Sequence, residues 1–397
     1  MMLNVMMAAA LAGWTGVVSP KTEGWTFKAS DAKDGMVYNP FEGTFPDKGG
    51  QLFSPEIALP QSAAEGGYYR FAFTAESEDR AFEGVNYYAA DGKELPDRYD
   101  VIYPGKSKYD RVFYAMPGTA KVKLFFQGGK PFKVSDVTVE PVTWKEAADY
   151  ADRVLAAIPK CDFSAPADAF ALLPRTKAAL AGGKPWRVVM LGDSNSQDLY
   201  HSLFHALVKR EFPKSDLRFL VSMRGSTGVA WYGDPEHPER IAEYVTGPKP
   251  DLLVIGGATN FRVQERPDEV GARLARVVKA AKAAGIEVLV NTPMPAMDTR
   301  LNPWTPNFNP DLTKDLGPME FDVKKNFWCG QTYKPEVMRK VADEEKVAFW
   351  DFTCQGYEYI FRSGKPYMWF GRDDYHSGER GKQAWGRLYL EYWKRAK

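Results

Sequence analysis

The chain has 397 residues, which is too long for one ordinary domain and favours two units. Lys and Arg total 52 against 51 Asp and Glu, a formal net charge of +1 that argues against the basic field used to bind nucleic acid or an anionic membrane. With 44% hydrophobic and 26% charged residues, the composition is globular and excludes a disordered chain.

The N-terminus carries an apolar stretch that ends in Ala10-Leu11-Ala12-Gly13, whose two alanines flank a leucine in the small-x-small pattern of a signal-peptidase site. No Lys or Arg precedes this stretch, so a buried N-terminal segment and a misplaced start codon stay open as alternatives. We expect residues 1–19 to be a leader and the protein to be secreted or periplasmic. No later apolar run reaches the roughly 20 residues of a membrane helix, so no membrane span is expected.

The front half alternates short β-branched and aromatic stretches, such as 69–75, 111–115 and 120–126, with Gly- and Pro-containing turns. This cadence predicts an antiparallel β-sandwich over residues 20–143. Its tyrosines fit either a glycan platform or, as we favour, ordinary sheet packing; they are Tyr87, Tyr88, Tyr99, Tyr103 and Tyr109. Residues 144–184 predict a helix followed by a linker.

From residue 185 to 397 the pattern changes to aliphatic strands that alternate with helical stretches. This alternation predicts an α/β unit with a parallel sheet covered on both faces, whose ligands bind at the carboxyl ends of the strands. The strands are expected at 187–191, 218–222, 252–255 and 286–290, and the helices at 197–212 and 270–278.

A candidate nucleophile follows the first of these strands in the sequence Gly-Asp-Ser-Asn-Ser, residues 192–196. Ser194 at a tight strand-to-helix turn is exposed at the sheet edge, beside unpaired backbone N–H groups of the helix. The alternative is an ordinary capped turn. Near the C-terminus, Asp373 and His376 share one loop, so that the carboxylate can orient the imidazole that takes the serine proton. Asp374 is an alternative partner for the histidine, and a lone surface histidine is the plainer interpretation.

Two further loops after strands offer donors for a negatively charged oxygen. Residues 224–228 contain two glycines, whose backbone N–H groups can approach a substrate closely. Residues 256–260 end in Asn260, whose side-chain amide can donate to the same oxygen. Ordinary Gly-rich turns are the alternative for both loops.

Four short blocks, residues 192–196, 224–228, 256–260 and 373–376 in chain order, resemble the motifs of the SGNH or GDSL-type hydrolase superfamily, and the resemblance covers about 186–397. The resemblance implies a three-layer α/β/α sandwich with a parallel sheet, and an ester hydrolase that needs no metal or other cofactor. The sequence departs from the family in the third block, which usually reads Gly-x-Asn-Asp. Here one extra residue precedes Asn260, and Phe261 stands in place of the Asp.

Carried over by position, Ser194 would be the nucleophile, His376 the general base and Asp373 its orienting carboxylate. The oxyanion hole would consist of the Ser194 N–H, the Gly228 N–H and the Asn260 side chain. The front β-sandwich is similar to the jelly-roll modules attached to exported carbohydrate-active enzymes, an analogy of fold alone.

Aromatic side chains cluster in sequence around these blocks, and their flat faces suit stacking on sugar rings. Packing of the same side chains in the core is the alternative. Three arginines, Arg224, Arg262 and Arg372, suit an anionic group such as a uronate. The candidate substrate contacts are Arg224, Trp231, Tyr232, Trp328, Trp369 and Phe370.

We therefore expect a serine-dependent carboxylic ester hydrolase that removes acetyl groups from a polysaccharide or oligosaccharide. A non-catalytic glycan-binding protein on the same scaffold and a lipase or thioesterase are the alternatives. His201 and His205 stand four residues apart, but two histidines make an incomplete metal site, and packing is favoured. No nucleotide-binding motif occurs. Among the 3 cysteines, Cys329 and Cys354 are the pair that can form a disulfide.

Overall fold

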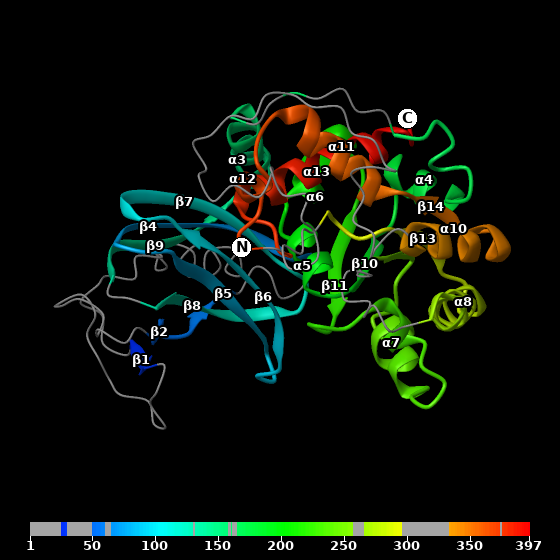
Figure 1. Ribbon diagram of the computed structural model, residues 1–397, viewed down its shortest axis with the longest axis horizontal. Coiled ribbons are helices and arrows are strands. Elements are labelled where there is room, and N and C mark those ends of the chain that lie inside the picture. Colours follow the sequence, from blue (N-terminus) through cyan, green and yellow to red (C-terminus); the bar gives the residue numbers. More distant parts are fainter. Residues whose placement is uncertain are drawn as a thin grey trace, which may run out of the picture. The chain divides into compact units, whose positions relative to one another are not determined.

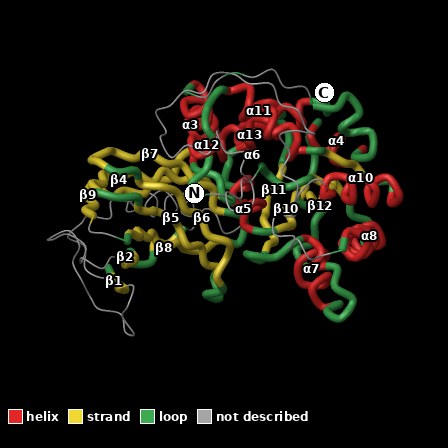
Figure 2. The backbone as a smooth tube through the Cα atoms, in the orientation of Figure 1, coloured by secondary structure: helices red, strands yellow, loops and turns green. Residues whose placement is uncertain are grey.

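The protein is described from a computed structural model. The chain divides into two compact units, Met1–Ala147 and Ala148–Lys397. Figure 2 shows strands in the first unit and strands interleaved with helices in the second. The structure describes residues 25–29, 50–59, 65–129, 132–157, 160, 165–256, 266–295, 333–373 and 375–397.

The first unit contains two antiparallel sheets among its described residues. In one, the strand order is β1-β2-β8-β5-β6, with β3 also paired to β8, and in the other it is β7-β4-β9. The strands of the larger sheet are β1 (Thr26–Ala29), β2 (Gly50–Phe53), β3 (Ile57–Ala58), β5 (Ala81–Ala89), β6 (Glu94–Ile102) and β8 (Thr119–Gly128). Those of the smaller sheet are β4 (Gly67–Ser77), β7 (Gly105–Ala115) and β9 (Phe132–Val142).

Both sheets contribute to one hydrophobic core. Phe71 from the smaller sheet lies 5.9 Å from Phe126 of the larger sheet, measured between ring centroids. Alternate residues along each strand face this core, which is why the sequence alternates. Tyr87 and Tyr109 are buried in it, whereas Tyr88, Tyr99 and Tyr103 are half-buried. Sheet packing therefore accounts for Tyr87 and Tyr109, and the five tyrosines do not form one exposed platform.

The predicted parallel sheet is confirmed in the second unit. The strand order is β11-β10-β12-β13-β14, and every neighbouring pair is parallel. Gly192 pairs with Met223, and Leu191 pairs with Ile255, so the carboxyl ends of β10, β11 and β12 lie at one edge. The strands are β10 (Trp186–Gly192), β11 (Leu217–Met223), β12 (Leu252–Ile255), β13 (Glu287–Asn291) and β14 (Ala348–Trp350).

Helices pack against this sheet from both sides (Figure 1). Alternate side chains of β10, β12 and β13 form a core with α7, α8 and α10. Helix α5 contacts β10 and β11, helix α6 contacts β11, and α13 packs against α5 and α6. The helices are α3 (Trp144–Ala156), α4 (Pro174–Leu180), α5 (Ser194–Tyr200), α6 (Phe204–Glu211), α7 (Val229–Tyr232), η1 (Ile241–Thr246, a π-helix), α8 (Pro267–Ala283), α10 (Tyr333–Glu345), α11 (Phe352–Ser363), α12 (Tyr367–Phe370) and α13 (Glu379–Lys394).

The helical stretch predicted at 197–212 is wrong in one respect, because it forms two helices. Leu203 separates α5 from α6 with a left-handed backbone, φ +57°. A leucine in this conformation is strained, but its side chain is fully buried. Burial of Leu203 therefore outweighs a local helical preference that continues through this position.

Replacing Leu253 by Ala is expected to lower the free energy of unfolding by about 2–5 kcal/mol. Leu253 is fully buried in β12, the middle strand of the parallel sheet, and the truncation leaves a cavity. Urea unfolding of the full chain measures the change. The same truncation at Leu172, which is 50% exposed, is the control and should change the value by less than about 0.5 kcal/mol. Equal effects of the two variants would contradict the packing described.

Candidate active site

The turn after β10 presents Ser194 as the first residue of α5. Asp193 before it is extended, and its carboxylate caps the helix by accepting a hydrogen bond from the Asn195 N–H at 3.0 Å. Gly192 has no room for a side chain, because a Cβ there would clash with the Ser196 hydroxyl. Glycine and the capping aspartate thus make the turn tight and leave Ser194 at the carboxyl edge of the sheet.

The loop between α12 and α13 is short and closed by backbone hydrogen bonds. Gly371 and Ser377 form an antiparallel bridge, and the Arg372 N–H donates to the His376 carbonyl at 2.9 Å. Asp373 Oδ1 accepts from the backbone N–H groups of Tyr375 and His376, both at 2.8 Å. The backbone therefore holds this carboxylate in place before any side chain contacts it.

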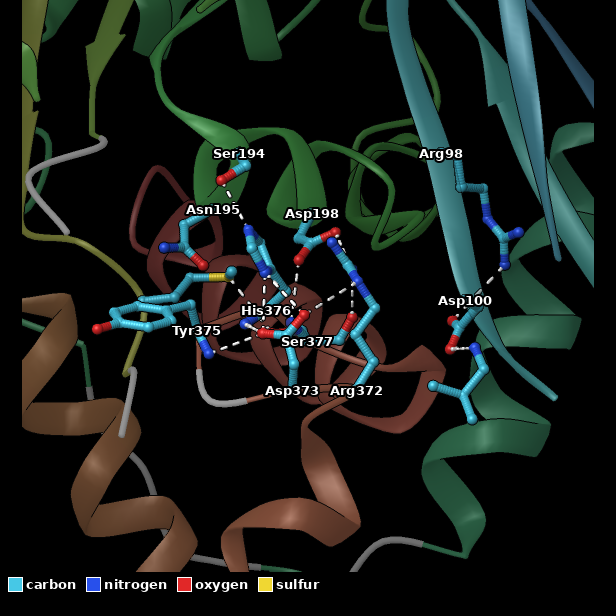
Figure 3. A network of polar contacts seen from close by, with 12 residues as sticks. Arg98, Asp100, Ser194, Asn195, Asp198, Arg372, Asp373, Tyr375, His376 and Ser377 are labelled. Carbon is cyan, nitrogen blue, oxygen red and sulfur yellow. Dashed lines mark hydrogen bonds and ion pairs between the residues drawn. The ribbon is translucent and has the colours of Figure 1, made fainter. Parts of the chain in front are cut away.

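Ser194, His376 and Asp373 form one chain of hydrogen bonds (Figure 3). His376 Nδ1 lies 2.9 Å from each carboxylate oxygen of Asp373, and His376 Nε2 lies 2.8 Å from Ser194 Oγ. Because an ionised carboxylate only accepts, Nδ1 carries the proton that faces Asp373. In the neutral ring, Nε2 is then free to accept the serine hydroxyl proton. Asp373 is thus the carboxylate that faces the histidine, while Asp374 lies outside the described residues.

The Asp373 carboxyl is held in its charged form. Burial acts to raise its pKa, but the His376 hydrogen bond, the charges of His376 and Arg372, and the Tyr375 N–H together lower the pKa from 3.8 to about 2. Asp373 therefore stays ionised throughout the neutral range, as an orienting carboxylate must.

Arg372 does not face a substrate, which corrects the expectation that it recognises an anionic group. Its side chain is 1% exposed and donates to Asp198 Oδ1 at 2.6 Å and to the Ser377 carbonyl at 2.8 Å. Sequence reasoning missed Asp198. Its position one turn after Ser194 on a helix was the available signal, but nothing in the sequence pairs it with Arg372.

The second block lies beside the end of β10. The Tyr232 hydroxyl donates to the Gly192 carbonyl at 2.5 Å and accepts from the Arg224 N–H at 2.8 Å. Tyr232 is completely buried, so it is not available to stack on a sugar, and that expectation is wrong. Gly228, half-buried with φ −93° and ψ 164°, immediately precedes α7.

The other predicted substrate contacts divide by exposure. Arg224 is exposed and Trp231 is half-buried, with the Arg224 guanidinium 4.8 Å and the Arg240 guanidinium 3.8 Å from the Trp231 ring centroid. Phe370 is 1% exposed and stacks on buried Trp385, so its assignment to the cleft is also wrong. Trp369 is 8% exposed, and the Arg380 guanidinium lies 4.4 Å from its ring centroid. The predicted residues outside the described ranges are Asn260, Arg262 and Trp328.

His201, which follows α5, and His205 of α6 belong to the protein interior. His201 and His205 are 1% and 3% exposed, and burial lowers the pKa of His205 to about 3, with a smaller opposing effect from the Tyr200 backbone. Within the described ranges, no group of three His, Cys, Asp or Glu side chains is placed to hold a metal ion. Cys354 is described, but Cys329 lies outside the described residues, so their pairing stays a prediction. In the described part of the chain, no helix is long and apolar enough to cross a membrane.

A scan against protein-family models and a search of curated proteins find no match. Among solved structures, the chain is similar to an acetylxylan esterase from Geobacillus stearothermophilus, with 16% identity, a TM-score of 0.40, and 53% of this chain and 95% of that chain covered. It is similar to a two-domain esterase active on acetylated mannans, with 15% identity and a TM-score of 0.41, where 57% of this chain and 53% of that chain are covered. It is also similar to a peptidoglycan O-acetylesterase, with 12% identity and a TM-score of 0.32, where 92% of this chain and 74% of that chain are covered.

Replacing Asp373 by Asn is expected to remove a pH-dependent part of the stability. Since the carboxyl has a pKa of about 2 in the folded chain against an ordinary 3.8, the unfolded chain takes up the proton first as the pH falls. The difference in unfolding free energy between wild type and variant should therefore shrink as the pH falls from 3.8 to 2. Urea unfolding across pH 2–7 measures it, and a difference that stays constant down to pH 2 would contradict the lowered pKa.

Proposed function

We propose that the protein is a serine-dependent carboxylic ester hydrolase that removes acetyl groups from a carbohydrate. The observation that carries this proposal is the hydrogen-bonded chain from Ser194 Oγ through the His376 ring to the Asp373 carboxylate. A nucleophile, a base within 2.8 Å and a carboxylate that orients the base are the parts that acyl transfer needs.

In the proposed mechanism, His376 Nε2 takes the proton of Ser194 as the serine oxygen attacks the ester carbonyl. The protonated ring then gives this proton to the sugar oxygen as its bond to the carbonyl carbon breaks, which leaves an acetyl-serine. A water molecule, deprotonated by the same nitrogen, attacks the acetyl-serine carbonyl. The ring returns the proton to Ser194 Oγ as the bond from Oγ to the acetyl carbon breaks, which releases acetate and restores Ser194. Asp373 stays ionised and stabilises the imidazolium in both steps.

The negatively charged oxygen of each intermediate needs donors. We assign them to the N–H groups of Ser194 and Gly228 and to the Asn260 side-chain amide. The first lies at the start of α5, and the second lies in the loop that Tyr232 ties to the end of β10. The third rests on the sequence resemblance alone.

The same proposal extends to the architecture. Helices on both sides of the parallel sheet support the three-layer α/β/α sandwich of the SGNH hydrolases for residues 185–397. The two antiparallel sheets with a common core support a jelly-roll-like β-sandwich for residues 20–143, joined by residues 144–184. We propose a structural or site-completing role for this accessory domain, and export guided by the leader at 1–19.

An acetylated glycan is the substrate class that we favour. Arg224 and Trp231 are the predicted contacts that keep exposed surface, and a guanidinium beside an indole suits sugar hydroxyls or a uronate. The net charge of +1 favours a neutral or weakly acidic substrate. The non-catalytic glycan-binding alternative loses support, because His376 lies within hydrogen-bond distance of Ser194.

Replacing Ser194 by Ala should lower acetate release from acetylated xylan, mannan or a chromogenic acetyl ester by at least about 10³-fold. The matched control is Ser196→Ala, a buried serine of the same helix, which should retain turnover. A fluorophosphonate probe should label the wild type and Ser196→Ala but not Ser194→Ala. Full turnover by Ser194→Ala would exclude the proposed mechanism. Faster hydrolysis of long acyl chains than of acetyl would favour a lipase or thioesterase.

Replacing Trp231 by Ala should raise the KM for acetylated oligosaccharides about 5- to 10-fold, because the stacking face is lost. The KM for a small chromogenic acetyl ester should change little, since that ester carries no sugar to stack. Trp144→Ala, which removes another half-buried tryptophan beside a cation, is the control and should leave both values unchanged. Equal changes for the two substrates would argue against glycan contact at Trp231.

A further inference from the structure

Asp198 links the helix that begins at Ser194 to the loop that carries Asp373 and His376. It is 3% exposed and lies four residues after Ser194 on α5. Its Oδ1 accepts from Arg372 Nη1 at 2.6 Å, and its Oδ2 accepts from the Ser377 N–H at 2.9 Å. One buried carboxylate therefore binds the loop at two points.

These two points flank the Asp373–His376 pair. Arg372 directly precedes Asp373, Ser377 directly follows His376, and Arg372 Nη1 also donates to the Ser377 carbonyl at 2.8 Å. The Ser377 hydroxyl in turn accepts from Trp385 Nε1 of α13 at 2.7 Å. Figure 3 shows Asp198 and Arg372 beside the chain of hydrogen bonds that ends at Ser194.

The negative charge of Asp198 also determines which carboxylate Arg372 pairs with. Arg372 Nε lies 3.9 Å from Asp373 Oδ2, so a buried guanidinium without another partner would compete with His376 for that carboxylate. Asp198 neutralises Arg372 at shorter range and leaves Asp373 to the histidine. A buried ion pair contributes little net stability compared with apolar residues of similar volume, so stability alone does not account for it.

We propose that Asp198 and Arg372 are positioning residues that hold His376 at reacting distance from Ser194. This inference rests on the proposed ester hydrolysis. A misplacement of about 1 Å between reacting groups can cost about 10²-fold in rate. The contacts of Asp198 with Arg372 and Ser377, which we call the clamp, lie on either side of Asp373 and His376, so their loss is expected to lower kcat. The clamp does not contact the substrate, so KM is expected to change little.

The test compares Asp198→Asn, Asp198→Leu, Arg372→Met and the double variant Asp198→Leu/Arg372→Met, with kcat and KM measured on a chromogenic acetyl ester. Each single variant should lower kcat about 10- to 100-fold with KM within about 2-fold. The double variant removes both buried charges, so its kcat should lie near the kcat of each single variant. It should be well above the kcat expected if the two fold-losses simply multiplied. The double variant also guards against misfolding, since an apolar pair can replace a buried ion pair.

The control variant is Glu287→Gln. Glu287 is also a buried carboxylate that accepts backbone hydrogen bonds, from Arg175 and Thr176 at 2.8 Å, but it lies at the amino end of β13, opposite the edge that carries Ser194. Its loss should lower stability and leave the kcat of the folded fraction unchanged. If kcat in the Asp198 and Arg372 variants falls only in proportion to the folded fraction, the positioning role is overturned.

A spectroscopic readout separates this inference from the proposed function. The imidazole N–H that faces Asp373 should give a downfield proton signal in ¹⁵N-histidine-labelled protein, identified among the 4 histidines by its absence in His376→Gln. Asp198→Asn should shift or broaden this signal, and Glu287→Gln should preserve it. A wild type that hydrolyses no ester would overturn the proposed function but leave this measurement decisive. An unchanged signal in every Asp198 and Arg372 variant would overturn the clamp.

Discussion

The parallel pairing of β10 with both of its neighbours is the constraint on which the site depends. It places the end of β10 beside the ends of β11 and β12, so the chain must turn at Gly192 on a single edge of the sheet. Ser194 follows this turn, and the second block follows the adjacent strand end. The carboxyl edge of a parallel sheet collects loops from distant parts of a chain, and here it joins positions 182 residues apart.

The electrostatics of the site depend on an ordered set of charges rather than on a single pair. Burial opposes ionisation of Asp373, and hydrogen bonds and nearby positive charge overcome it, so that the pKa falls to about 2. Arg372 supplies part of that charge while its closest contact is with Asp198. The carboxylates thus have different partners: Asp198 holds the arginine, and Asp373 holds the histidine.

Sequence patterns identified the hydrogen-bonded residues because short motifs encode the local chemistry that brings them together. Ser194 follows a strand in a capped turn, and Asp373 and His376 share one loop, so each placement depends on few neighbours. Tyr232 and Phe370 were misassigned because stacking on sugar and stacking in a core use the same residue type, and burial is decided by distant segments. The break at Leu203 and the Asp198–Arg372 contact depend on tertiary packing, which local periodicity does not encode.

The Tyr232 hydroxyl has a consequence for how specificity can change. It anchors the Arg224 backbone to the Gly192 carbonyl, while α7 begins at Val229, so the second-block loop is tied at both ends. Between these anchors, side chains can be exchanged without displacing the turn that carries Ser194. Side chains at residues 225–227 can therefore vary in size and charge while the backbone that positions Ser194 stays fixed.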